Sequence, residues 1–463
     1  MSDSLRTVSP VDGRVYVERP LASPSEIEAL LAQASRAAGA WRSLGVADRV
    51  ALLRAAVASL VDQAPRLAEE LTWQMGRPVS QSPGELRGFQ ERAVRMLDTA
   101  EQALADLHPP GKPGFERWIR REPHGVVVVV APWNYPYLTS VNAVIPALAS
   151  GNVVVLKHSH QTPLCAERYA QAFQAAGLPP GVFQYVHAGH QEVERLVADP
   201  RVGFVCFTGS VEGGFAIQRA LSGGFTGSGL ELGGNDPAYV RPDADLSDAA
   251  ANLVDGSYFN SGQSCCGIER IYVHRSIHDR FVETFVDLAG RYRVGDPTLA
   301  ETTLGPMARA GAARQVRAQI AEAVAAGARP LLDPARFGVD PEHPYYLAPQ
   351  VLTRVDHSMR IMKSETFGPV VGIMAVDSDD EAVRLMNDSP YGLTASIWTR
   401  AESAARALAD RIETGTVFMN RCDYLDPDLA WTGVKHSGRG CTLSRVGYEH
   451  LTRPKSFHFR MAR

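Results

Sequence analysis

One cysteine and one glutamate are the side chains of this sequence best suited to covalent chemistry. Cys265 ends residues 260–265 (Asn-Ser-Gly-Gln-Ser-Cys), and Glu231 begins residues 231–235 (Glu-Leu-Gly-Gly-Asn). A thiol is a good nucleophile only where its thiolate is favoured, in a polar and partly exposed setting such as this Gly-Gln-Ser turn. A carboxylate can move the proton that the reaction displaces. The alternative is that Cys265 and Cys266 fill space in the core, as most free cysteines do.

The composition restricts the class of protein that could carry this chemistry. The chain has 463 residues, more than one hydrophobic core normally organises, so two or more domains are expected. A net charge of -4 gives no reason to expect a nucleic-acid partner. Six cysteines without a Cys-x-x-Cys pair argue against a disulfide framework or a metal site. The start lacks an apolar signal segment and no apolar run could span a bilayer, so we expect a soluble cytoplasmic protein without a membrane partner.

The first hundred residues predict helices. Residues 23–26 (Ser-Pro-Ser-Glu) have the spacing of a capping box, and apolar residues then recur over 27–41 with the period of a helix. Further helical patterns cover about 47–61 and 65–75. Residues 107–124 break this pattern, so we expect an extended excursion from the domain there.

Short apolar strands alternate with helix-compatible segments from residue 126 onward. The first region predicts strands at Val126–Val130, Val153–Leu156, Phe183–Val186 and Phe204–Phe207. A second alternating region, about 238–419, predicts strands at Arg270–Val273, Val370–Met374 and Thr416–Met419. This alternation is typical of a parallel sheet covered by helices on both faces. We therefore predict an α/β fold with two Rossmann-like parallel-sheet domains and a cleft between them.

Polar motifs follow the predicted strands of the first region. Residues 132–136 (Pro-Trp-Asn-Tyr-Pro) come after the first strand, Lys157 after the second, and residues 208–210 (Thr-Gly-Ser) after the fourth. In open α/β sheets, ligands bind beyond the carboxyl ends of the strands. The turn at 208–210 would open a helix, whose free N–H groups favour a phosphate. One such turn is weak evidence, but several at one sheet edge predict a ligand site.

Five motifs in one order make the chain resemble the aldehyde dehydrogenase superfamily. They are residues 132–136, 207–210 (Phe-Thr-Gly-Ser), 231–234, 260–265 and 365–369 (Glu-Thr-Phe-Gly-Pro). The likeness runs from about Val8 to the end and includes residues 433–438 (Gly-Val-Lys-His-Ser-Gly).

This resemblance implies oxidation of an aldehyde to a carboxylic acid with NAD or NADP. Cys265 would attack the aldehyde carbonyl to give a thiohemiacetal, and loss of hydride would leave a thioester. Asn134 matches the family's donor to the oxyanion, with the backbone N–H of Cys265 as its partner. Glu231 matches the general base that activates the hydrolytic water. Taken singly, Glu231 could be a solvated carboxylate and Asn134 a turn residue.

The resemblance also assigns the cofactor contacts. They are Trp133, Lys157, His160, Thr208, Gly209, Ser210, Glu365 and Phe367. His160 stands where many NAD-preferring members carry a glutamate that would repel a 2′-phosphate, so relaxed cofactor choice is predicted; alternatively, His160 caps a helix without touching the cofactor. A second departure is Thr442, which ends the run 437–442 where a glutamate is common. Glu231 is therefore expected to act through water alone.

The family's architecture implies a domain division and an oligomer. Residues 1–106 and 125–232 would form the NAD(P)-binding domain, and 233–440 the catalytic domain. Residues 107–124 and 450–463 would form a small β oligomerisation arm. A homodimer or homotetramer is implied, because exposed strand edges need a covering partner.

The predicted substrate is a medium-chain or aromatic aldehyde. By position in the family pattern, the tunnel to Cys265 would be lined by Tyr137, Phe259, Tyr424, Leu425 and Trp431. Such aromatic walls suit an apolar ligand, although each could equally pack the interdomain core. Arg421 lies close in sequence to the tunnel loop, so a semialdehyde with a charged group remains an alternative substrate.

A CoA-acylating enzyme is a further alternative, but those members generally lack the glutamate at the position of Glu231. A third alternative is a non-redox protein on this scaffold. Such a protein would not need the cysteine, the base and the nucleotide contacts together, so their joint presence argues against it.

Overall fold

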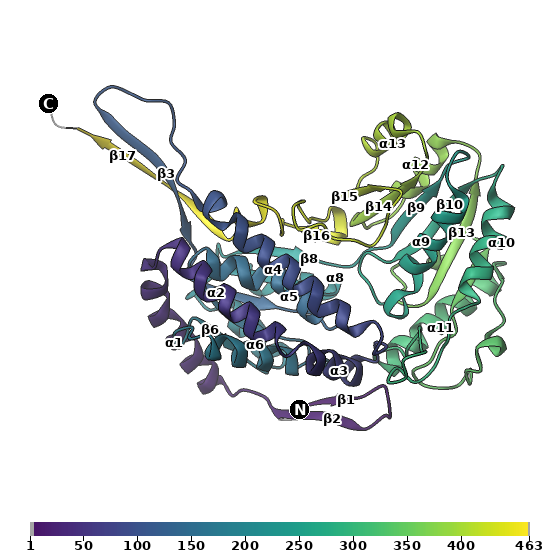
Figure 1. The fold of residues 1–463 in the computed structure, drawn as a ribbon, viewed down its shortest axis with the longest axis horizontal. Coiled ribbons are helices and arrows are strands. Elements are labelled where there is room, and N and C mark those ends of the chain that lie inside the picture. The colour runs from purple at the N-terminus through teal and green to yellow at the C-terminus, as the bar shows by residue number, and fades with distance from the viewer. Residues whose placement is uncertain (1–3, 462–463) are drawn as a thin grey trace.

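The computed structural model describes residues 4–461, so the predicted domain limits at residues 1 and 463 fall outside the described part. Two lobes are each built around a mainly parallel sheet, and a long two-stranded arm projects from the first lobe (Figure 1). The predicted α/β fold with two parallel-sheet units and a small β arm is confirmed. The division into domains stays a prediction.

The first sheet has six strands in the order β16-β8-β7-β4-β5-β6. Their bounds are β4 (Val126–Val130), β5 (Val153–Lys157), β6 (Phe183–Tyr185), β7 (Val202–Thr208), β8 (Gly227–Glu231) and β16 (Gly438–Arg439). Every residue of β4 and β5 is buried, as expected for strands covered on both faces. All four predicted strands are present. The sequence analysis missed β8, because its glycines lower strand propensity.

Helices cover both faces of this sheet. They are α1 (Pro24–Ser43), α2 (Val46–Val61), α3 (Ala64–Met75), α4 (Ser82–Leu104), α5 (Pro136–Ala149), α6 (Leu164–Ala175), α7 (His190–Ala198) and α8 (Val211–Leu221). The predicted capping box is confirmed, since Ser23 and Glu26 exchange hydrogen bonds at the start of α1. The expectation of helices throughout the first hundred residues is wrong at the start. There, β1 (Ser4–Val8) and β2 (Val15–Pro20) form an antiparallel hairpin.

The second sheet has seven strands in the order β11-β12-β13-β10-β9-β14-β15. They are β9 (Asp236–Val240), β10 (Ile268–His274), β11 (Arg329–Pro330), β12 (Gln350–Thr353), β13 (Val370–Val376), β14 (Thr394–Trp398) and β15 (Thr416–Met419). Its helices are α9 (Leu246–Tyr258), α10 (His278–Ala289), α11 (Ala310–Ala325), α12 (Asp379–Asn387) and α13 (Glu402–Ala409). All strand pairs are parallel except the one that β11 makes with β12. The three predicted strands of this region are present.

The arm consists of β3 (Phe115–Pro123) and β17 (Thr452–Arg460), which pair antiparallel along their whole length. The rings of Trp118 and Phe457 stack with their centroids 4.4 Å apart. The extended excursion predicted over 107–124 is therefore confirmed. Its role in oligomer formation stays a prediction.

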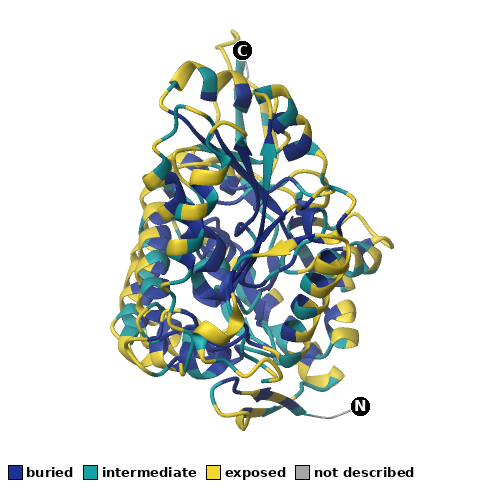
Figure 2. Cartoon of the chain, turned by 90° about the vertical axis from the view of Figure 1, so that its right-hand side faces the viewer, coloured by how far each residue is buried: buried dark blue, intermediate teal, exposed yellow. Residues whose placement is uncertain are grey.

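Burial follows the layers of the fold. Buried residues gather on the strands in the middle of the molecule, and exposed residues lie on the outer faces of the helices (Figure 2). None of the helices within residues 4–461 combines the length and apolar character needed to cross a bilayer.

Candidate active site

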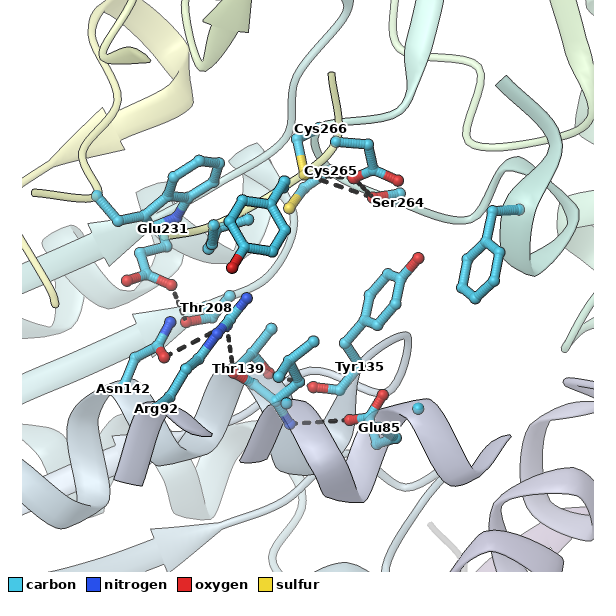
Figure 3. A pocket seen from close by; sticks show the side chains of 18 of the residues that line it. Glu85, Arg92, Tyr135, Thr139, Asn142, Thr208, Glu231, Ser264, Cys265 and Cys266 are labelled. Atoms are coloured by element: carbon cyan, nitrogen blue, oxygen red, sulfur yellow. Dashed lines mark hydrogen bonds between the residues drawn. The ribbon is translucent and has the colours of Figure 1, made fainter. Parts of the chain in front are cut away.

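Two cavities meet at Cys265. One, of about 430 Å³, is the candidate substrate pocket and the other, of about 660 Å³, is the candidate cofactor cleft. Cys265, Glu231 and Thr208 line both. Figure 3 shows the substrate pocket, with Cys265 and Glu231 projecting into it from different elements. The two residues singled out from the sequence are therefore brought together by the fold.

The backbone before Cys265 takes a strained path that projects the thiol into the cavities. Asn260 and Ser261 have left-handed backbone conformations, with φ of 53° and 57°. Gly262 also has a positive φ, and a Cβ there would lie 2.3 Å from the carbonyl oxygen of Gly368. Because only glycine fits so close an approach, Gly262 is needed to form this turn.

The neighbouring Cys266 differs from Cys265 in burial and bonding. Cys265 is partly exposed, whereas Cys266 is only 4% exposed and its Sγ donates to Asp423 Oδ1 at 2.9 Å. A hydrogen bond with Cys265, together with burial, raises the pKa of the Cys266 thiol. Both cysteines line the substrate pocket, and Cys265 is the more exposed thiol of the pair.

Glu231, the predicted base, ends β8 and is held by two hydroxyl groups. Its carboxylate accepts hydrogen bonds from Thr442 Oγ1 at 2.5 Å and from Thr208 Oγ1 at 3.2 Å. Burial raises the pKa of Glu231, and the two hydrogen bonds oppose that rise. A carboxyl group with a raised pKa is better matched to taking a proton near neutral pH.

Asn134, the predicted oxyanion donor, follows β4 and is 5% exposed. Its side-chain Nδ2 donates to the carbonyl oxygen of Gln263 at 3.2 Å, which ties it to the turn that carries Cys265. An amide nitrogen has two N–H groups, so one remains for a ligand. Its backbone carbonyl accepts from Asn260 Nδ2 at 3.2 Å and from the guanidinium of Arg77.

An ion pair that the sequence analysis missed supports Asn134. Arg77 pairs with Glu85 at 2.5 Å, and neither side chain is more than 1% exposed. Arg77 Nε also donates to Asn260 Oδ1 at 3.1 Å, and Glu85 Oε1 accepts the N–H groups of Tyr137 and Leu138 at the start of α5. No motif marks either residue, because both lie in helical or loop sequence far from the strand ends.

Most of the predicted cofactor residues line the cofactor cleft. They are Trp133, Lys157, Thr208, Gly209, Ser210, Glu365 and Phe367. Ser210 caps α8 through its hydroxyl, so the free N–H groups of that helix open into the cleft. Burial lowers the pKa of Lys157 to about 8, and no carboxylate within residues 4–461 pairs with its ammonium. Burial raises the pKa of Glu365 to about 8, and Glu365 Oε1 accepts the N–H of Gly234 at 2.9 Å.

These groups fit a nicotinamide dinucleotide. A helix N-terminus and a buried ammonium suit phosphate and ribose oxygens, and a carboxyl group such as Glu365 suits ribose hydroxyls. In contrast, the described residues contain no cluster of three His, Cys, Asp or Glu side chains that could hold a metal ion.

Two predicted site residues lie elsewhere. Tyr137 is 1% exposed and packs in the core against Phe89 and Tyr169, outside the substrate pocket. His160 is not among the residues that line the cofactor cleft, and its Nε2 lies 2.9 Å from the carbonyl oxygen of Ala188. The predicted contacts of Tyr137 with substrate and of His160 with the cofactor are therefore not supported by these positions and stay predictions. Ser159 and His190, which the sequence analysis did not single out, line the cofactor cleft instead.

The substrate pocket contains the other predicted residues and an unexpected cation. Phe259, Tyr424, Leu425 and Trp431 line it as expected. Arg92 of α4 also points into it, beside Asn142 and Thr139 (Figure 3). Arg92 Nη1 donates to the carbonyl oxygen of Leu138 at 2.6 Å and to Asn142 Oδ1 at 3.4 Å.

Arg92 is a buried cation that forms no direct ion pair within residues 4–461. It is 6% exposed, and the carboxylates of Glu85 and Glu231 act on its charge from beyond contact distance. Burial lowers its pKa. The Nδ2 atom of Asn142 is likewise buried and has no hydrogen-bond partner in the described part. Arg421, the arginine noted from the sequence, instead stacks over the ring of Tyr424 with its Cζ 3.5 Å from the centroid.

Comparison with known proteins identifies the family to which this site belongs. The model of the aldehyde dehydrogenase family matches residues 1–457. The chain belongs to the aldehyde dehydrogenase family. It is therefore an enzyme of NAD(P)-dependent aldehyde oxidation, as the resemblance implied.

Three similar proteins within the family are named for the same activity. Succinate-semialdehyde dehydrogenase [NADP(+)] 1 of Mycobacterium tuberculosis H37Rv is 34% identical over 98% of this chain and 99% of its own. Succinate semialdehyde dehydrogenase [NAD(P)+] Sad of Escherichia coli K12 is 33% identical over 95% of both chains. The crystal structure of succinic semialdehyde dehydrogenase from Streptococcus pyogenes with NADP+ is 29% identical, superimposes with a TM-score of 0.93, and covers 98% of this chain and 100% of its own.

Proposed function

We propose that this aldehyde dehydrogenase oxidises a small semialdehyde that carries a carboxylate, giving a dicarboxylate, with NAD or NADP as the cofactor. The observation that carries the proposal is the guanidinium of Arg92 in the substrate pocket. This charged substrate replaces the apolar aldehyde that the aromatic residues suggested.

Burial of Arg92 favours an anionic ligand. Burial of a charge that has no directly bonded counter-ion is unfavourable, and a carboxylate binds a guanidinium through strong charge-assisted hydrogen bonds. Only Nη1 of Arg92 has hydrogen-bond partners among residues 4–461, so its other N–H groups remain for a ligand. Asn142, whose Oδ1 accepts from Arg92, lines the same pocket. Relatives named as succinate-semialdehyde dehydrogenases, at 33% and 34% identity, support the same substrate class.

The chain's own residues support a two-stage reaction. Cys265 attacks the aldehyde carbon, while the remaining N–H of Asn134 Nδ2 and the backbone N–H of Cys265 stabilise the oxyanion. The nicotinamide cofactor, when bound in the cleft by Lys157, Ser210 and Glu365, supplies the acceptor for the hydride. Glu231 then takes a proton from a water molecule as its oxygen attacks the thioester carbon. The carbon–sulfur bond breaks, and the carboxylic acid leaves.

The presence of Glu231 favours hydrolysis over transfer to CoA. Glu231 and Cys265 line the same two cavities, so a water molecule activated by the carboxylate can reach the acylated sulfur. An enzyme that passes its acyl group to CoA must keep such water away. We therefore propose that the product is released as the free acid.

The test compares aldehydes in the parent and in Arg92→Met. The parent should have a higher kcat/KM for succinate semialdehyde than for hexanal or benzaldehyde. Arg92→Met should lower kcat/KM for succinate semialdehyde about a hundredfold, or about 2.7 kcal/mol, while hexanal changes by less than about threefold. Arg87→Met is the matched control, since Arg87 is an exposed cation on the same helix that also lines the pocket. A parent that prefers hexanal, or an equal loss with both aldehydes, would refute the proposal.

We also propose that the arm joins copies of the chain into a homodimer or homotetramer. Phe459 of β17 is 50% exposed beside Trp118, so the arm presents apolar rings and free strand edges. A chain that ends at Leu451 should sediment as a monomer, whereas the full chain should not. A full chain that is monomeric at micromolar concentration would contradict this proposal.

A further inference from the structure

The substrate pocket has a carboxylate as well as a guanidinium in its wall. Asp423 lies in the loop that follows β15, and it lines this pocket together with Arg92 of α4. Ser264 and Cys266, the residues on either side of Cys265, both donate hydrogen bonds to Asp423. Figure 3 shows these two donors on one side of the pocket and Arg92 on the opposite side. Groups that can carry opposite charges therefore lie in two different walls.

Asp423 has one oxygen without a protein donor. Its Oδ1 accepts from Cys266 Sγ at 2.9 Å and from Ser264 Oγ at 3.2 Å. Its Oδ2 accepts no hydrogen bond from the described part of the chain, and no cation there forms an ion pair with it. Arg421, two residues away, stacks over the ring of Tyr424 instead. Because a carboxylate can accept at both oxygens, Oδ2 is available to a donor on a ligand.

The surroundings of Asp423 disfavour its negative charge in the free enzyme. Burial, with a smaller contribution from the carboxyl group of Asp255, raises the pKa of Asp423 to about 7, although its two hydrogen bonds oppose that rise. A carboxylate in this position gains more from a cation that enters with the ligand than a solvated one does. Contact with an ammonium group would lower the pKa again and keep Asp423 ionised.

The other acidic residues of the pocket differ from Asp423 in their contacts or exposure. Glu231 accepts a threonine hydroxyl at each of its two oxygens. Glu85 is engaged in its buried ion pair and in the N–H groups that begin α5. Glu91 and Asp255 line the pocket but are exposed to solvent, which weakens any contact that they make with a charged ligand. Asp423 is therefore the acid of this pocket best placed to select a cation.

We propose that the substrate is a zwitterion, a short semialdehyde that carries an ammonium group as well as a carboxylate. Arg92 binds the carboxylate and Asp423 Oδ2 accepts a hydrogen bond from the ammonium group, which leaves the aldehyde carbon at Cys265. An apolar aldehyde gains from neither contact, and a semialdehyde without the amine gains from Arg92 alone. The inference rests on the proposed binding of a carboxylate by Arg92.

Two aldehydes that differ only in an amino group test this inference. They are succinate semialdehyde and L-aspartate β-semialdehyde, which has an ammonium group on the carbon next to the carboxylate. In the parent, kcat/KM should be about tenfold higher for the amino compound, or about 1.4 kcal/mol. Butanal, which carries neither charge, should be the poorest substrate of the three.

Asp423→Asn should reverse the preference between the two semialdehydes. The amide keeps an oxygen for Ser264 and Cys266 but carries no charge, so kcat/KM for aspartate semialdehyde should fall about thirtyfold. For succinate semialdehyde it should rise, because the repulsion between the substrate's carboxylate and Asp423 is removed. A purely structural defect would lower both values. Asp426→Asn, in the same loop but outside the pocket lining, is the matched control and should leave their ratio unchanged.

A second measurement uses the parent alone, so it decides even if Asp423→Asn does not fold. L-aspartate and succinate, the two oxidation products, should slow the alkylation of Cys265 by iodoacetamide, followed by mass spectrometry. Aspartate should protect at about a tenth of the concentration that succinate needs.

The outcomes separate this inference from the proposed function. Equal kcat/KM values for the two semialdehydes in the parent, equal protection by the two products, or a parallel loss with both substrates in Asp423→Asn would overturn the zwitterion and leave Arg92 as the carboxylate site. A parent that prefers butanal to both semialdehydes would instead overturn the proposed function itself.

Discussion

Arg77 and Glu85 form a buried ion pair that connects Asn134 to the helix that follows it. Arg77 contacts the carbonyl of Asn134 and the side chain of Asn260, while Glu85 accepts the first N–H groups of α5. The carboxylate also lies at the positive end of the helix dipole. One pair of charges thus fixes the loop between β4 and α5 against the turn that carries Cys265.

Breaking this pair should destabilise the protein and disorder the site. Glu85→Gln leaves the Arg77 charge buried and uncompensated, so the free energy of unfolding should fall by about 3–5 kcal/mol. Urea denaturation measures this change. Arg54→Met, which breaks the partly exposed pair with Asp98, is the control and should change stability by only about 0–1 kcal/mol. Equal effects of the two substitutions would contradict this account.

The two adjacent cysteines should respond differently to serine. Cys265→Ser should abolish aldehyde oxidation, because a hydroxyl group is a far weaker nucleophile than a thiolate. Cys266→Ser should retain most activity, since a serine hydroxyl can still donate to Asp423. Steady-state rates of the two variants, with circular dichroism as the check on folding, decide the matter. A loss of the same size in both would reject Cys265 as the nucleophile.

The hydroxyl of Thr442 should set the pH at which Glu231 becomes active. Donation from Thr442 lowers the pKa of Glu231 against the rise that burial causes, so Thr442→Val should raise that pKa. A base works only when deprotonated, so the acidic limb of the steady-state profile should move to higher pH. Thr442→Ser, which keeps the hydroxyl, should keep the parent's profile. An acidic limb that stays in place in Thr442→Val would show that this contact does not tune the base.

Cofactor binding should weaken in alkaline solution through Lys157. Its pKa is about 8 in the absence of ligand, and a bound phosphate or ribose oxygen favours the charged form. The attraction is therefore complete below pH 8 and is lost as the pH rises through and above that value. Titration calorimetry with NADP+ between pH 7 and about 9.5 should show a rising Kd. Lys157→Met should bind more weakly and without this pH dependence, and a parent whose affinity is constant over the range would contradict the prediction.

The sequence was most informative where a motif follows a strand. The ends of β4, β5 and β7 hold Asn134, Lys157 and Ser210, and the structure brings these residues to one edge as the strand pattern required. Orientation within a helix was harder to predict. Successive helical residues point about 100° apart, so Leu138 lines the substrate pocket while its neighbour Tyr137 packs in the core.

Arg92 shows the other limit of sequence analysis. It lies in the middle of α4, where an arginine ordinarily faces solvent, and no local pattern distinguishes it from the exposed Arg87 or Arg95. Its position depends on how α4 packs against α5, which is a tertiary contact between distant segments. The glycine-rich β8 was missed for a related reason, because its pairing with β7 overrides its weak propensity.

The pairing of β16 with β8 has a consequence for synthesis of the chain. The first sheet receives its last strand from residues 438–439, and Leu443, Tyr448 and Leu451 enter the hydrophobic core of the same lobe. A ribosome must therefore synthesise the chain as far as residue 451 before this lobe can close. Until then, the free edge of β8 can pair with other chains, and contacts so distant in sequence form slowly. We expect chains truncated or stalled before residue 438 to aggregate. We also expect chaperones to raise the yield of folded enzyme, even if the folded protein is itself stable.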